Sequence, residues 1–339
     1  MSVTSQITTF DDMVTDLMNR IRVATGSTTD SNIVKRYLNI ALHDMHLGFD
    51  YRVPWAERRA VLRTQDDYST GTITATRGSA NIVGVGTLWN TANAFGITNL
   101  RANGKIVING SRVPYKILTV STDTTATLST AFTEPTATAG GYLYYEDEYD
   151  LVSDFLRPVD LQQFSDALNI DLISRTEARR RYTNNTVPGR PKVASVVDFA
   201  PSSNTTPIRR VQLFPPPNDY LLIPYSYITS LLATSAAGVG QTSMSATTDE
   251  PIVPLRYRHA IVYHALYSWY RDRKDDARSG EAKGEYNDIM LRISLDQDIG
   301  APRPQLRPRV SSYVRAAKSP YRRGGRRFDS NGAFDRLEI

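Results

Sequence analysis

The side chains that could support chemistry are few in this sequence, and their spacing does not complete a catalytic or metal site. None of the 339 residues is cysteine, which excludes disulfide bonds, thiolate metal sites and thiol nucleophiles together. His43 and His46 are three positions apart on a predicted helix and could share one face, but two histidines do not make a metal site. We expect both on a helix surface or at an interface. His259 and His264 are five positions apart, which favours packing in a core or an interface for each.

Four carboxylates form an acidic cluster where a predicted strand ends, namely Glu146, Asp147, Glu148 and Asp150. Paired carboxylates can act as general acid and base or bind calcium, but this run lacks the spacing of an EF-hand loop. We expect a solvated or subunit-facing charge cluster. The sequence also contains no Walker loop, Gly-x-Ser-x-Gly elbow or His-Glu-x-x-His motif. It therefore favours a protein that is not an enzyme and that uses no metal or cofactor.

Positive charge is concentrated in a C-terminal arm, residues 300–339. Residues 300–328 hold nine arginines and lysines and no acidic residue; because the whole chain carries +5, the remainder carries −4. Prolines argue against a long helix here, and aromatic residues alternate with the arginines, as in segments that order on a partner. Protein docking, contact with nucleic-acid phosphates and no specific role all stay open, with docking favoured. The predicted partner-binding residues are Tyr313, Arg315, Tyr321, Arg322, Arg323, Arg326, Arg327 and Phe328.

Helices are predicted near both ends of the remaining chain. Apolar residues recur at intervals of three and four over 11–24, 31–49, 255–272 and 281–295. A short loop joins the first two segments and another joins the last two, so each pair is expected to form an antiparallel hairpin. We expect the two hairpins to pack into one bundle.

Between the hairpins the pattern changes to that of strands. Short β-type runs between 72 and 145 alternate with turn residues, and Asn109-Gly110 is the strongest hairpin signal. This favours a small antiparallel sandwich or barrel. A helix is expected over 159–169, three strands between 192 and 227, and a mobile linker over 235–248.

The predicted fold class is therefore α+β: a helical bundle from N- and C-terminal helical hairpins, with an inserted antiparallel β domain and an extended C-terminal arm. The first ten residues lack the apolar core of a signal peptide, and residues 221–240 are too interrupted for a membrane span, so we expect a soluble protein. The predicted divisions are an N-terminal helical hairpin (1–69), an inserted small β sandwich or barrel (70–148), a helix with strands and linker (149–248), a C-terminal helical hairpin (249–299) and the basic arm (300–339).

Four stretches of the sequence, taken in order, carry a resemblance to a known family: Gly71–Trp89, Tyr149–Pro158, Val211–Tyr225 and Asp249–Pro254. Together they resemble the head-to-tail connector (adaptor) proteins of tailed bacteriophages. The first looks like the opening of a β module common in phage connector and tail proteins, and the second like the segment that follows that module. The third is similar to their strand–turn–strand, and the fourth to the start of their C-terminal helical hairpin.

The resemblance implies a virion structural protein that forms a ring, commonly of twelve copies, in the neck between portal and tail after assembly in the host cytoplasm. It implies as partners other copies of the chain, the portal protein, tail or nozzle proteins and passing double-stranded DNA without sequence specificity, and no membrane. C-terminal segments of such adaptors grip the portal. A slightly acidic body suits a channel that DNA passes without adhering. The alternatives are a tail or baseplate structural protein with the same β module, and a nucleic-acid-binding protein acting through the arm.

Overall fold

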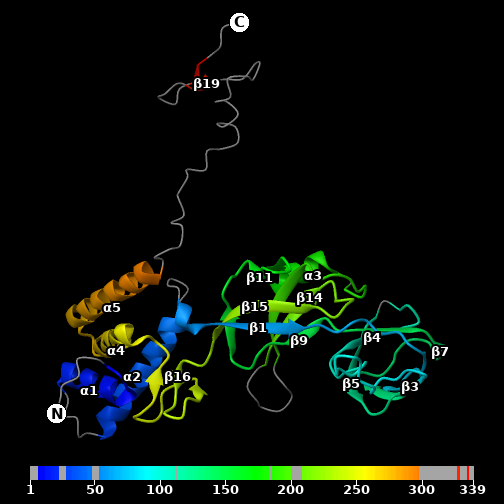
Figure 1. The fold of residues 1–339 in the computed structure, drawn as a ribbon, viewed down its shortest axis with the longest axis horizontal. Coiled ribbons are helices and arrows are strands. Elements are labelled where there is room, and N and C mark those ends of the chain that lie inside the picture. The colour runs from blue at the N-terminus through cyan, green and yellow to red at the C-terminus, as the bar shows by residue number, and fades with distance from the viewer. Residues whose placement is uncertain are drawn as a thin grey trace. The chain divides into compact units, whose positions relative to one another are not determined.

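The protein is rich in β-structure. The computed structural model describes residues 7–22, 28–47, 53–111, 113–183, 185–199, 208–297, 327–328 and 334–335. The chain divides into two compact units, Met1–Tyr286 and Asn287–Ile339. The larger unit is built mainly from sheets, the largest of which has seven strands and is curled (Figure 1). The predicted fold class, a helical bundle with an inserted β domain, is wrong. The described chain is built mostly from the many strands over 57–251, and its helices are fewer than its strands.

The helices lie close to where periodicity predicts them. α1 (Phe10–Ile21) starts with a capping box between Thr9 and Asp12. It ends at Arg22, whose positive φ of 57° stops the helical hydrogen bonding. Its apolar stripe packs against α2 (Thr28–Leu47), and α2 packs against α4 (His259–Asp272). The remaining helices and 3-10 turns are α3 (Arg175–Arg181), α5 (Asp276–Gln297), η1 (Pro54–Ala56) and η2 (Leu255–Tyr257).

The seven-stranded sheet is antiparallel throughout, with strand order β7-β2-β3-β6-β5-β4-β8. Its two edge strands, β7 and β8, are separated in sequence by Gly141 alone, so the sheet must curl to bring its edges near each other. Asn109 and Gly110 both have positive φ, as the predicted tight turn requires. The strands are β2 (Thr72–Ala75), β3 (Asn81–Val85), β4 (Lys105–Ile108), β5 (Tyr115–Val120), β6 (Thr125–Leu128), β7 (Ala137–Gly140) and β8 (Tyr142–Tyr145).

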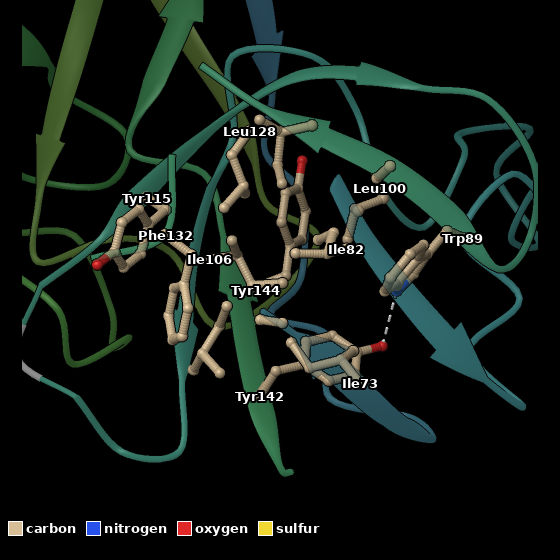
Figure 2. Packing of buried hydrophobic residues seen from close by; sticks show 14 of the residues in the cluster. Ile73, Ile82, Trp89, Leu100, Ile106, Tyr115, Leu128, Phe132, Tyr142 and Tyr144 are labelled. Atoms are coloured by element: carbon tan, nitrogen blue, oxygen red, sulfur yellow. Dashed lines mark hydrogen bonds between the residues drawn. The ribbon is translucent and has the colours of Figure 1, made fainter. Parts of the chain in front are cut away.

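The inner side of this sheet is filled by aromatic and aliphatic side chains (Figure 2). Trp89 is fully buried, and its Nε1 donates a hydrogen bond to the Tyr142 hydroxyl at 3.0 Å. That hydroxyl donates in turn to the Thr70 carbonyl at 2.6 Å. The polar ends of both aromatic residues are thus satisfied inside the core, as buried tryptophan and tyrosine require.

A five-stranded sheet follows, with order β11-β12-β13-β14-β9 and one parallel pair, β12 with β13. The predicted helix over 159–169 is wrong, because β11 lies there and Phe164 stacks on Tyr225 at 5.2 Å between ring centroids. Packing between sheets overrides the local period in that segment. The strands are β9 (Glu148–Asp150), β11 (Gln163–Ser165), β12 (Ile170–Leu172), β13 (Val193–Phe199) and β14 (Ile208–Phe214).

A three-stranded antiparallel sheet has the order β1-β15-β10, from β1 (Glu57–Arg63), β15 (Leu222–Thr229) and β10 (Phe155–Pro158). The central strand contains Pro224, which cannot donate to a ladder. The sheet can contain Pro224 in its central strand because Pro224 has a strand partner on one side only. There it pairs with Val61 of β1, whereas β10, on the other side, pairs only with Tyr227–Thr229 and does not reach Pro224. Inward residues of this sheet share a core with the five-stranded sheet.

The predicted mobile linker over 235–248 is wrong where it contributes to a small sheet of β16 (Ala233–Thr234), β17 (Gly240–Gln241) and β18 (Glu250–Pro251). The Asn39 amide exchanges two hydrogen bonds with the Met244 backbone, each 2.9 Å long. These bonds tie the segment to α2. In the smaller unit, β19 (Arg327–Phe328) pairs antiparallel with β20 (Phe334–Asp335).

Candidate functional site

Most of the predicted partner-binding residues fall outside the described part of the chain. Arg327 and Phe328 form β19, where they pair with Asp335 and Phe334 of β20. The role of the eight residues in docking stays a prediction. The six that lie outside the described residues are Tyr313, Arg315, Tyr321, Arg322, Arg323 and Arg326.

The two histidines of α2 do not form a surface pair, because His46 is fully buried while His43 is half-buried. The His46 Nδ1 lies 2.7 Å from the Leu42 carbonyl, and the Trp55 Nε1 donates to the His46 Nε2 at 3.0 Å. A carbonyl can only accept and an indole N–H can only donate, so the proton of neutral His46 is on Nδ1. Burial lowers the pKa of His46 to about 4. The expectation of a surface position is wrong for His46, which instead links α2 to η1.

The acidic cluster is not a solvated patch. Glu146 and Asp147 are 6% and 1% exposed. The Arg101 guanidinium clasps the Glu146 carboxylate, with Nε at 2.9 Å from Oε1, and the Tyr144 hydroxyl donates to the same Oε1 at 2.5 Å. Buried carboxylates persist only with such partners, since an unpaired charge in a low dielectric is costly. For these two residues the expectation of a solvated or subunit-facing cluster is wrong.

Asp147 joins two sheets. The Lys105 ammonium of β4 lies 2.6 Å from its carboxylate, and the Gln212 amide of β14 donates to it at 2.9 Å. Next to it, the buried Arg210 donates to Asp150 at 2.5 Å. The network therefore connects the seven-stranded sheet to the five-stranded one. Its partners are far apart in sequence, so no local pattern reveals them. Among the described residues, no group of three or more histidine, aspartate or glutamate side chains is placed to hold a metal ion.

One solvent-facing surface, which we call the β1 face, combines apolar and basic side chains. Val61 is 61% exposed and Leu222, on the neighbouring strand, is 56% exposed. Phe95, at 53% exposure, extends the surface: its ring contacts Tyr220 at 4.9 Å between centroids, and the Arg63 guanidinium lies 5.4 Å from its centroid. We define the β1 face by Arg59, Val61, Arg63, Phe95 and Leu222.

Exposed apolar groups that lie together and are bordered by arginine are typical of protein-binding surfaces. A cavity of about 810 Å³ opens beside the β1 face, lined in part by Arg59, Asp160, Pro224 and Ser226. Such a surface can bind another chain, and its composition offers no nucleophile paired with a base. The sequence pattern of residues 57–63 did not predict that they form a strand or that most of their side chains are exposed.

A second group of arginine and aromatic side chains in contact with one another lies on the helices. The Arg273 guanidinium covers the Trp269 ring at 3.3 Å, and Arg20 lies over Tyr263 at 4.8 Å. The Tyr37 hydroxyl donates to Asp272 at 2.6 Å and the Tyr37 ring meets Trp269 edge-on. Arginine and aromatic residues in contact are enriched in protein interfaces, although the same contacts also stabilise a helical surface.

The chain matches the model of a known protein family. The family described as SU10 adaptor protein matches residues 121–309, more than half of the chain, and the chain belongs to that family. The protein is accordingly a bacteriophage structural adaptor, a component of the virion that contacts other virion proteins. No curated protein matches the chain.

The matched region begins at the turn between β5 and β6 and ends inside the basic arm. It contains three of the four stretches that carry the resemblance to connectors, and Gly71–Trp89 precedes it. Within the described residues, no helix has the length and apolar character needed to cross a membrane.

Proposed function

We propose that this adaptor is a head-to-tail connector that forms a ring, commonly of twelve copies, between the portal and the tail in the virion neck. The observation that carries the proposal is membership of the adaptor family over residues 121–309, which reaches into the arm. On this proposal the role is structural and not enzymatic, and no cofactor is needed. The ring would assemble in the host cytoplasm and later let double-stranded DNA pass.

The basic arm is the proposed portal anchor. Residues 300–328 contain nine basic residues and no acidic residue, so this segment favours binding to an acidic protein surface. The aromatic residues among them, Tyr313, Tyr321 and Phe328, supply the buried contact area that arginine alone does not. The remainder of the chain, at −4, would repel the DNA phosphates and so avoid holding the genome in the channel.

Reconstitution with the portal protein of the same phage tests the proposal. Mass photometry and negative-stain images of the chain with portal should show a ring attached to the portal, and deletion of residues 300–339 should abolish attachment. A chain that stays monomeric with portal present would contradict the proposal.

A matched charge variant sharpens this test. Substitution of Arg322, Arg323, Arg326 and Arg327 by alanine should weaken portal attachment. The control removes the same number of arginines from α3, the residues Arg175, Arg179, Arg180 and Arg181, and should leave attachment intact. Equal losses from both sets would show that total charge, and not the arm, governs binding.

The two alternatives give different results in the same experiments. A nucleic-acid-binding protein acting through the arm would retain DNA with an affinity that falls steeply with salt, and would lose DNA when the arm is removed. A tail or baseplate protein would bind tail proteins and never portal.

A further inference from the structure

β1 offers a free strand edge. It pairs with β15 on one side, and no strand of the described residues pairs with it on the other. The Thr64 N–H donates to the Leu221 carbonyl at 3.0 Å, which sets the phase of the ladder. Since backbone groups alternate in direction along an antiparallel strand, those of Arg59, Val61 and Arg63 point away from β15. This edge can therefore accept one more strand.

The side chains at this edge select the chemistry of that strand. Arg59, Val61 and Arg63 lie on the exposed β1 face, while Leu62 on the opposite side is buried in the core. β1 as a whole carries three arginines and one glutamate, a charge of +2. Arginine on an edge strand discourages pairing with a strand of like charge. The added strand should therefore be acidic and apolar.

Repulsion between like charges argues against two segments of this chain as the strand added to β1. A second β1 carries the same charge of +2, and in the antiparallel register centred on Val61 it would bring Arg59 opposite Arg63, which destabilises a strand pair. The arm over 300–328 carries nine positive charges and would be repelled in the same way.

The distal segment, Phe328–Ile339, has the required composition. It holds Asp329, Asp335 and Glu338 against Arg336 alone, a charge of −2, together with four large apolar residues, Phe328, Phe334, Leu337 and Ile339. The other segments outside the described residues do not match it. Residues 1–6 and 200–207 carry no charge, 23–27 carry none either, and 48–52 balance one aspartate with one arginine.

We propose that the distal segment of a second copy of this chain docks on the β1 face by adding a strand to the free edge of β1. β20 (Phe334–Asp335) pairs with β19 on one side, which leaves its other edge for β1. Main-chain hydrogen bonds supply affinity in strand addition, and alternate side chains supply specificity. Asp335 would meet the arginines of the β1 face, and Leu337 and Ile339, which lie on the same side of an extended strand as Asp335, would cover Val61, Leu222 and the neighbouring cavity.

Site-directed cross-linking tests this proposal in the full chain, because the absence of cysteine makes each introduced thiol unique. A Val61→Cys chain is mixed with a Leu337→Cys chain that carries a tag of different mass, and a short bismaleimide is added. We expect a cross-linked heterodimer on a denaturing gel. The control is Val239→Cys, in the β16–β17 turn, because Val239 has the same exposure as Val61, 61%.

The same readout overturns the proposal. Heterodimer yields that are equal for Val61→Cys and Val239→Cys would do so. A single chain that carries both Val61→Cys and Leu337→Cys and that links only within itself would also overturn it, because the second copy is then not the partner.

A charge exchange gives an independent check. The changes Arg59→Glu and Arg63→Glu should reduce the heterodimer to the control level, and Asp335→Arg in the other chain should raise it again. Loss without restoration would contradict the assigned pairing. No portal is present in these experiments, so their failure would leave the portal-anchor proposal standing, and failure of portal attachment would not affect them.

Discussion

The indole N–H of Trp55 donates to Nε2 of His46, and this 3.0 Å hydrogen bond joins α2 to the turn that precedes β1. Nδ1 of the same ring is engaged by the Leu42 carbonyl at 2.7 Å. Protonation of Nε2 would break the bond to Trp55 and place a charge among apolar neighbours. The contact between helices and sheet is thus tied to the neutral state of one histidine.

We expect acid to destabilise the fold through His46. Burial lowers the pKa of His46 from its ordinary 6.5 to about 4, so the unfolded chain binds the proton more readily than the folded one. The stability from the neutral ring is complete above the unfolded pKa and is lost as pH falls from 6.5 toward 4. The loss should total about 3 kcal/mol.

Urea unfolding at several pH values gives the free energy of unfolding as a function of pH. The slope of that free energy against pH, between pH 6.5 and 4, should be smaller in His46→Gln than in the wild-type chain. His43 and Arg157 also act on the ring, and both oppose its protonation. An unchanged slope in His46→Gln would contradict the prediction.

The Lys105–Asp147 pair should contribute strongly to stability. Asp147→Leu leaves the Lys105 ammonium and the Gln212 amide without their shared acceptor, in a site where the Asp147 side chain is 2% exposed. Removing one partner of a buried pair costs about 3 kcal/mol or more.

A double-mutant cycle with Lys105→Met measures the coupling, and the double variant should lose less than the sum of the single ones. The control is the exposed pair of Arg180 and Glu177, where Arg180→Ala should cost far less than Asp147→Leu because solvent screens the pair. Additive losses at Lys105 and Asp147 would show that the two do not interact.

Tyr142→Phe should destabilise the seven-stranded sheet by about 1–3 kcal/mol, because the Trp89 indole and the Thr70 carbonyl both lose a buried partner. Thermal and urea unfolding measure the change. The control, Val83→Ala on the exposed side of β3, should cost less than about 0.5 kcal/mol. A Tyr142→Phe variant as stable as the control would mean that the hydroxyl is replaceable.

Alanine substitutions at Gly71 and Gly78 can distinguish the cost of steric crowding from the cost of backbone strain. Gly71 and Gly78 both have positive φ, 86° and 83°, so alanine is strained at either position. A Cβ at Gly71 would lie 2.5 Å from the Val85 carbonyl oxygen, whereas one at Gly78 meets nothing within 4 Å. Gly71→Ala should therefore lower the free energy of unfolding by more than Gly78→Ala, by about 1 kcal/mol or more. Equal losses would show that strain alone sets the cost.

The sequence pattern located local structure better than it located the fold. The apolar periodicity over 11–24 and the tight turn at Asn109-Gly110 both follow from neighbouring residues, and the structure contains the helix and the turn. The fold class does not follow in this way, since it depends on how sheets distribute over 57–251.

The misplaced features are those fixed by distant partners. Phe164 lies in a strand because Tyr225 stacks on it, and the carboxylates of Glu146 and Asp147 are buried because Arg101 and Lys105 face them. His46 is buried by a tryptophan that follows the end of its helix. None of these pairings leaves a periodic signal in a single sequence, because periodicity reports only which face of an element is apolar. The β1 face was missed for the same reason.

The far edge of the three-stranded sheet has a different character from β1. β10 is short, its register with β15 shifts between Phe155 and Arg157, and it ends at Pro158, which has no N–H to offer. The sheet can therefore grow in one direction only. Each chain then has one acceptor edge at β1 and, on our proposal, one donor strand in its distal segment, so copies would join head to tail and must close into a ring to avoid an open-ended fibre.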